Sequence, residues 1–200
     1  MKFRQPILRM LPSYDEYDEE GRQVRVLYPE EYLELRKAAG KYENQLRLDL
    51  CLLTTARYSE LLELQVNKQW FDGHSIHIVE HKVKRKQRGV RDRYIHLSDM
   101  GKQVVAAFLN NKDIRLSTYS AMRQNLHRWA KYVDIDTTSL SIHSLRATGE
   151  SWLMFYYPEK TIPILQSTGH TERTALLHYL NLPFNDLDRV MMRPYLGGWE

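Results

Sequence analysis

Hydrophobic residues recur with helical spacing over most of the chain from residue 29 onward. The segment from Pro29 to Lys37 has proline and acidic residues in its first turn and basic residues in its last, with Gly40 beyond, as a helix should. A second helix over 43–54 places three leucines on one face. Further helices are predicted at 99–110, 118–132, 142–156, 159–167, 171–180 and 184–192.

Between residues 70 and 97 the spacing changes from helical to alternating. Ile76 and Ile78 alternate with polar residues, Gly89 marks a turn, and an apolar strand resumes over 94–97. This pattern predicts a β-hairpin. The fold class is therefore α+β, mainly α-helical, with a small antiparallel hairpin or sheet on one side.

The chain divides into three parts by pattern. Residues 1–27 mix prolines, charges and an acidic patch without sustained periodicity, which predicts an N-terminal arm or linker. One folded domain is expected over 28–182, because 42% hydrophobic residues suffice for a full core. Residues 183–200 are an apolar tail that is expected to pack on its own domain or on a neighbouring protomer.

Composition narrows the setting in which the chain works. The single cysteine, Cys51, lies in an apolar run and excludes an intrachain disulfide framework, which favours a reducing cytoplasm. No apolar stretch approaches the roughly 18 to 20 residues that cross a bilayer. The three histidines at 74, 77 and 81 are a poor zinc site, because only two of them share a strand face. We therefore expect neither a membrane span nor a metal.

The hairpin tip is strongly basic although the net charge is only +4. The segment 82–93 carries seven Lys and Arg against one Asp, a density suited to neutralising phosphates. The alternative is an ordinary solvated hairpin. The candidate DNA-binding arginines in this segment are Arg85, Arg88, Arg91 and Arg93.

Arg57 lies between an apolar helix and a leucine-rich one, so its guanidinium is expected at a helix junction inside the domain. An arginine held there needs an anionic partner, and Glu60 is the local candidate. The pair is either purely structural or serves to orient Arg57 toward a phosphate. Ser59 is the predicted N-cap of the helix that follows.

A second group of candidate residues lies in the C-terminal half. Ser141 is expected to cap a helix that presents His143 and Arg146 about one turn apart on one face. Gly169 is expected to end one helix, with His170 opening the next. Tyr179 follows nine residues after that histidine. Each of these residues taken singly has an ordinary structural explanation.

Taken in order, these motifs resemble the active site of the tyrosine recombinases, the phage-integrase family. That family has an Arg within Thr-Gly-x-Arg-x-Ser-Glu-Leu, a hairpin Lys, His-x-x-Arg, Gly-His, and a Tyr nine residues later. The chain departs mildly with Thr55 and Ala56 in the first motif and with Ser144 in the second. The resemblance covers roughly residues 28 to 182. It implies the catalytic residues Arg57, Lys82, His143, Arg146, His170 and Tyr179.

The resemblance also implies a mechanism. The two arginines would clamp a DNA phosphate, the histidines would accept the tyrosine proton or hydrogen-bond the phosphate, and Tyr179 would form a 3′-phosphotyrosyl link. Lys82 would protonate the 5′-oxygen, with Lys84 and Lys86 as alternatives because all three share one strand face. No cofactor is expected. The partners would be double-stranded DNA and further copies of the chain, in a prokaryotic cytoplasm and on a viral or other mobile element.

Two other functions remain open at this point. Type IB topoisomerases share this catalytic fold and site, so the same chemistry would relax DNA. A DNA-binding module with this fold and no cleavage activity is the other alternative. Family members usually carry a further N-terminal domain that completes a clamp around DNA, whereas only 27 residues precede the expected catalytic domain here.

Overall fold

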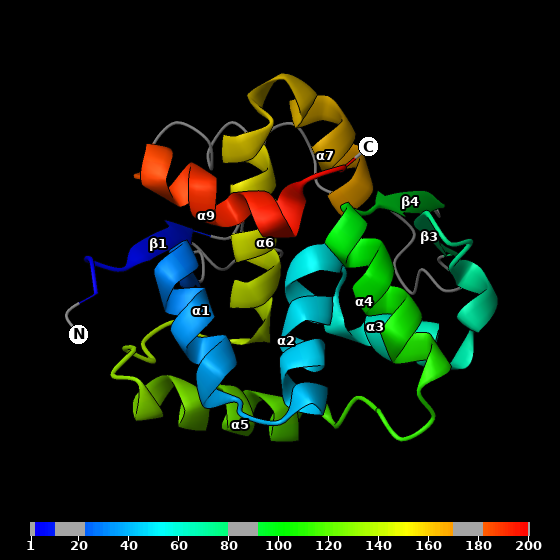
Figure 1. Cartoon of the computed structure of the whole chain (residues 1–200), viewed down its shortest axis with the longest axis horizontal. Coiled ribbons are helices and arrows are strands. Elements are labelled where there is room, and N and C mark those ends of the chain that lie inside the picture. The colour runs from blue at the N-terminus through cyan, green and yellow to red at the C-terminus, as the bar shows by residue number, and fades with distance from the viewer. Residues whose placement is uncertain (1–2, 11–22, 80–91, 170–181, 200) are drawn as a thin grey trace, which may run out of the picture.

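The computed structural model describes residues 3–10, 23–79, 92–169 and 182–199. Helices dominate these ranges, with two small antiparallel sheets at the periphery (Figure 1). The elements are β1 (Ile7–Met10), β2 (Gln23–Val26), α1 (Pro29–Ala38), α2 (Tyr42–Thr54), α3 (Tyr58–Val66), η1 (Lys68–Trp70), β3 (Ser75–Ile78), β4 (Arg93–His96), α4 (Asp99–Asn110), α5 (Tyr119–Tyr132), α6 (Ile142–Tyr156), η2 (Pro158–Lys160), α7 (Thr161–Thr168) and α9 (Asp186–Leu196).

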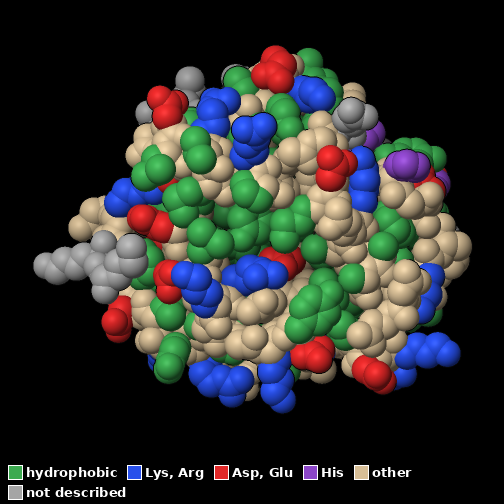
Figure 2. All heavy atoms as spheres, in the orientation of Figure 1, with side chains coloured by type: hydrophobic (Ala, Val, Ile, Leu, Met, Phe, Trp, Pro, Cys, Tyr) green, Lys and Arg blue, Asp and Glu red, His purple; other side chains and the backbone are tan. Residues whose placement is uncertain are grey.

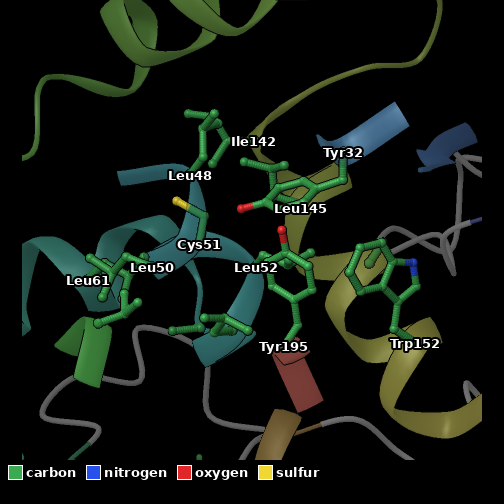
Figure 3. Packing of buried hydrophobic residues seen from close by; sticks show 14 of the residues in the cluster. Tyr32, Leu48, Leu50, Cys51, Leu52, Leu61, Ile142, Leu145, Trp152 and Tyr195 are labelled. Carbon is green, nitrogen blue, oxygen red and sulfur yellow. The ribbon is translucent and has the colours of Figure 1, made fainter. Parts of the chain in front are cut away.

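Helix α6 is the centre of the domain. It is buried along nearly its whole length and packs against α2, β2 and α9 (Figure 1). Trp152 of this helix meets Tyr32 and Tyr195 edge to face, with ring centroids 5.7 and 5.8 Å apart (Figure 3). The helix that carries the predicted His-x-x-Arg motif is therefore among the best-packed parts of the described structure.

The two helices α2 and α6 approach each other at a glycine. A Cβ added to Gly149 would lie 2.1 Å from the backbone oxygen of Leu52. Only glycine permits this approach, which brings the end of α2 close to the middle of α6. The loop that carries Arg57 follows directly from that end of α2.

The helical part of the sequence-based prediction is confirmed over the described residues. The helix predicted at 159–167 divides into η2 and α7, and α9 continues to Leu196, beyond the expected end at 192. The β-hairpin is also confirmed by the pairing of β3 with β4, in which Ile76 lies opposite Ile95. The helix expected at 171–180 lies outside the described residues.

The N-terminal segment contributes more to the fold than its sequence pattern predicted. β1 and β2 pair antiparallel, and β2 packs on α6. Two arginines are buried there: Arg9 forms an ion pair with Glu150 at 3.3 Å, and Arg25 pairs with Glu31. The charges of these two arginines are thus neutralised by one carboxylate on α6 and one on α1.

Helix α9 packs against α1, α4 and α6 of its own chain (Figure 1). Met192, Tyr195 and Leu196 are buried, and Trp199 is buried beyond the helix. Exchange of this tail between protomers stays a prediction. No helix in the described ranges is long and apolar enough to span a membrane.

Candidate active site

The junction of α2 and α3 places Arg57 at the edge of the domain. Thr55 ends α2 with φ +50°, the left-handed conformation that glycine adopts at least cost, so the turn forms although the glycine of the resembled motif is absent. The hydroxyl of Thr54 accepts the Ala56 N–H at 3.2 Å and supports this turn. The Arg57 side chain is 41% exposed, so it is more accessible than the position inside the domain that the sequence predicted.

Helix α3 begins two residues earlier than expected. Its first residue is Tyr58 and Arg57 is the N-cap, so the prediction of Ser59 as the N-cap is wrong. The physical reason is Glu60, whose carboxylate accepts the Arg57 backbone N–H at 2.6 Å and takes over the capping role. The same carboxylate thereby fixes the backbone that carries Arg57.

The Glu60 carboxylate is the meeting point of three arginines. Arg57 Nη1 donates to Oε1 at 2.8 Å, and the two Nη atoms of Arg93 donate to Oε1 and Oε2 at 2.8 and 2.7 Å. Arg146 Nη1 lies 4.0 Å from Oε2. The prediction that Glu60 partners Arg57 is confirmed by these contacts, and residues far apart in sequence form one cationic cluster around a single carboxylate.

Arg146 lies at the back of this cluster on α6. Its side chain is only 2% exposed, and Nη2 donates to the Thr168 carbonyl at 2.6 Å. Ser141 is the N-cap of α6, as predicted, and His143 is half-buried one turn before Arg146. The spacing of the His-x-x-Arg motif therefore places both side chains in the first turns of the central helix.

The electrostatics of the cluster favour a bound anion. Burial acts to raise the pKa of Glu60, but the hydrogen bonds and charge of Arg93, together with Arg57, outweigh it and lower the pKa to about 2. Burial, with repulsion from Arg57, lowers the pKa of Arg146 to about 10, so this arginine stays charged at neutral pH. Three guanidinium groups therefore surround the Glu60 carboxylate, and Glu150 also stabilises the charge of Arg146, so an anionic ligand would meet a cluster in which cations outnumber carboxylates.

Gly169 ends α7 in the left-handed conformation, with φ +72°, as predicted for a glycine at this position. The last carbonyls of α7 bind the arginine cluster: Arg93 Nε donates to Ser167 O at 3.1 Å, and Arg146 donates to Thr168 O. The end of α7, after which His170 follows in sequence, is thereby attached to the site.

The remaining predicted residues lie outside the described residues, and their roles stay predictions. They are Lys82, Lys84, Lys86, Arg85, Arg88, Arg91, His170 and Tyr179. Within the described ranges, no three His, Cys, Asp or Glu side chains lie close enough together to hold a metal ion.

Arg93 is the residue whose environment sequence reasoning missed. The sequence places it in the predicted DNA-binding segment, but its side chain is only 9% exposed and pairs with Glu60. The signal available in the sequence was its place at the start of an apolar strand, Arg93 to His96, rather than in the preceding basic run. A contact with DNA remains a prediction for this arginine.

The arrangement of α2, α3, the β3–β4 hairpin and the central α6 is the fold of the tyrosine-recombinase catalytic domain. Among solved structures, the XerA recombinase matches with a TM-score of 0.60 and 18% identity over 84% of this chain and 64% of that one. The Tn1549 transposon integrase in complex with circular intermediate DNA matches with a TM-score of 0.59 and 17% identity over the same shares.

The XerH site-specific recombinase bound to its difH substrate matches with a TM-score of 0.55 and 16% identity over 76% of this chain. This chain spans 64% of the first two structures and 49% of the XerH chain. No family model matches the sequence, and no curated protein matches it. At these identities the likeness establishes the fold.

Proposed function

We propose that this chain is a site-specific DNA recombinase that cleaves and rejoins strands through a 3′-phosphotyrosine intermediate. The observation that carries the proposal is the convergence of Arg57 and Arg146 on the Glu60 carboxylate, within a recombinase fold. A guanidinium offers a planar fork that fits the non-bridging oxygens of a phosphodiester and stays charged. Arg57 is accessible and Arg146 is buried behind it, so a phosphate would be held against the domain.

The proposed reaction needs only the residues of the chain. The Tyr179 oxygen attacks the phosphorus, a P–O bond to tyrosine forms, and the bond to the 5′-oxygen breaks. His143 or His170 accepts the phenol proton, and Lys82, or in its place Lys84 or Lys86, protonates the departing 5′-oxygen. The link conserves the energy of the phosphodiester, so the 5′-hydroxyl of another strand reverses the step without metal or ATP.

DNA as the partner is supported by a cationic helix that begins beside the site. The Tyr119 ring at the start of α5 lies 5.9 Å from that of Tyr58, the residue after Arg57. From there α5 exposes Arg123, Arg128 and Lys131 and contains no acidic residue. Lys and Arg side chains also lie along the lower edge of the face shown in Figure 2, where the connection from α1 to α2 crosses in front of α5 (Figure 1). We infer that this helix faces the DNA backbone and that several copies of the chain assemble on DNA.

The setting that we propose is the cytoplasm of a prokaryotic host, with the chain encoded by a virus or another mobile element. Two observations support this setting. The fold resembles that of a transposon integrase, and the single cysteine of the chain is buried and free, as is usual in a reducing cytoplasm.

The test is covalent capture of DNA. The protein is incubated in EDTA with supercoiled plasmid and with a library of nicked duplexes of random sequence, and the reaction is stopped with SDS. We expect DNA covalently attached to the wild type and to the control Tyr42→Phe, an exposed tyrosine at the start of α2, but not to Tyr179→Phe. Sequencing the captured duplexes would reveal the target site.

Other outcomes separate the alternatives. Capture that survives in Tyr179→Phe would show that another residue is the nucleophile. DNA binding without capture by any variant would support the non-cleaving module. Relaxed closed topoisomers without strand exchange between duplexes would support topoisomerase activity.

A further inference from the structure

Arg93 uses every nitrogen of its guanidinium within the protein. Its two Nη atoms donate to the two oxygens of Glu60 at 2.8 and 2.7 Å, and Nε donates to the Ser167 carbonyl at 3.1 Å. A two-pronged contact of this kind fixes the orientation of both partners more closely than a single hydrogen bond does. The Arg93 side chain thus links α3 to the end of α7 through hydrogen bonds.

The Arg93 side chain has little room to adopt another conformation. The side chain is 9% exposed, and it lies against Gly169, where an added Cβ would be 3.1 Å from Arg93 Cδ and 3.2 Å from Nε. Gly169 already needs its positive φ, and it also leaves space for the arginine. The next carbonyl along α7, that of Thr168, accepts from Arg146. Two arginines therefore hold consecutive carbonyls at the negative end of the α7 dipole.

Arg93 also links the basic hairpin to the site. It is the first residue of β4, opposite Ile78 in β3, and it is the last residue of the basic segment 82–93 that contains the candidate lysines. The strand into which that segment leads is thereby attached to Glu60. The carboxylate in turn holds the side chain and backbone of Arg57.

We infer that Arg93 is a positioning residue, which fixes Glu60 and the end of α7 and through them aligns Arg57 and Arg146 toward a phosphate. The inference rests on the proposed function as far as the phosphate is concerned, whereas the alignment itself is a property of the free protein. Arg93 does not touch the phosphate in this scheme. Its contribution is geometric, so a lysine at the same place should not replace it, because an ammonium keeps the charge without the fork.

The test compares Arg93→Lys with Arg189→Lys. Arg189 is a matched control because its Nη atoms donate to the Phe155 and Tyr156 carbonyls at the end of α6, at 2.9 and 3.1 Å, away from Glu60. Urea unfolding of both variants sets conditions in which each is folded. The first readout is the heteronuclear Overhauser enhancement of Arg57 Nε, whose signal is identified by its loss in Arg57→Lys.

We expect Arg93→Lys to reduce that enhancement, because Glu60 no longer holds Arg57 in one orientation, and Arg189→Lys to leave it unchanged. The second readout is the rate of covalent DNA capture at saturating DNA. We expect Arg93→Lys to lower it about 10- to 100-fold, the loss that accompanies a small misalignment of a catalytic group, with half-saturation unchanged. Should Arg93→Lys not fold, Arg93→Gln takes its place.

An unchanged Arg57 signal in the folded Arg93 variant would overturn the inference, and so would capture at the wild-type rate. If the wild type captures no DNA, the proposed function fails while the Arg57 signal still decides whether Arg93 positions it. A loss of capture that appears equally in Arg189→Lys would reduce Arg93 to a structural residue and would also overturn the inference.

Discussion

Replacement of Glu60 by glutamine removes the carboxylate around which the three arginines gather. The variant keeps the size of the side chain and part of its hydrogen bonding, so its effect isolates the charge. Glu60 is 13% exposed, and its pKa falls from 4.5 to about 2 on folding. A difference of about 2.5 units corresponds to roughly 3 kcal/mol of stability at neutral pH, at about 1.4 kcal/mol per unit.

The sign of the pH dependence follows from the lowered pKa. Because the folded protein binds the Glu60 proton less readily than the unfolded chain, the contribution is fully present above about pH 5. It is lost as the pH falls toward the folded pKa of about 2. The difference in unfolding free energy between wild type and Glu60→Gln should therefore be roughly 3 kcal/mol at pH 7. It should shrink by about 1 kcal/mol per pH unit below pH 4.5.

The assay is urea unfolding of both proteins followed by tryptophan fluorescence at pH 7, 5, 4 and 3.5. Glu63→Gln is the control, since Glu63 lies one turn further along α3 and is exposed, and it should change stability by less than about 0.5 kcal/mol at pH 7. A stability difference for Glu60→Gln that stays constant across this pH range would refute the reasoning, because it would show that packing rather than charge is responsible. A difference below about 1 kcal/mol at pH 7 would refute the strength assigned to the arginine cluster.

Two further predictions concern the helix packing and the DNA surface. Gly149→Ala should lower the unfolding free energy by about 2 kcal/mol, because its Cβ would meet the Leu52 carbonyl at 2.1 Å. The control is Gly101→Ala, whose Cβ would meet only side chains at 3.3 Å or more and which should change the unfolding free energy by less than about 1 kcal/mol. Equal effects of the two substitutions in urea unfolding would contradict the close approach of α2 and α6. Replacing both Arg123 and Arg128 by glutamine should reduce the steepness with which the logarithm of the DNA-binding constant falls against the logarithm of the salt concentration, by about 2. The measurement is fluorescence anisotropy with a labelled duplex at several salt concentrations. An unchanged slope would show that α5 does not face DNA.

The sequence by itself determined the elements that depend on local pattern. Helical spacing and capping residues fix α1, α2, α4 and α6, because a helix closes its hydrogen bonds within a few residues. The pair of Arg57 and Glu60 was also accessible to sequence reasoning, since residues three apart at a helix start are neighbours in space. The order of the motifs pointed to the recombinase fold before any contact was known.

Tertiary structure decided which distant residues meet. Arg93 and Arg146 join Glu60 from a strand and a helix that lie 33 and 86 positions away, and no local rule indicates that these three side chains share a site. Burial of the charged β1–β2 segment was likewise hidden, because Arg9 is stabilised in the interior by groups on α6, which are the Glu150 carboxylate, the Ser151 hydroxyl and the Ala147 carbonyl. A charged residue in a sequence shows that it needs a partner or water, and only the folded chain determines which of the two it obtains.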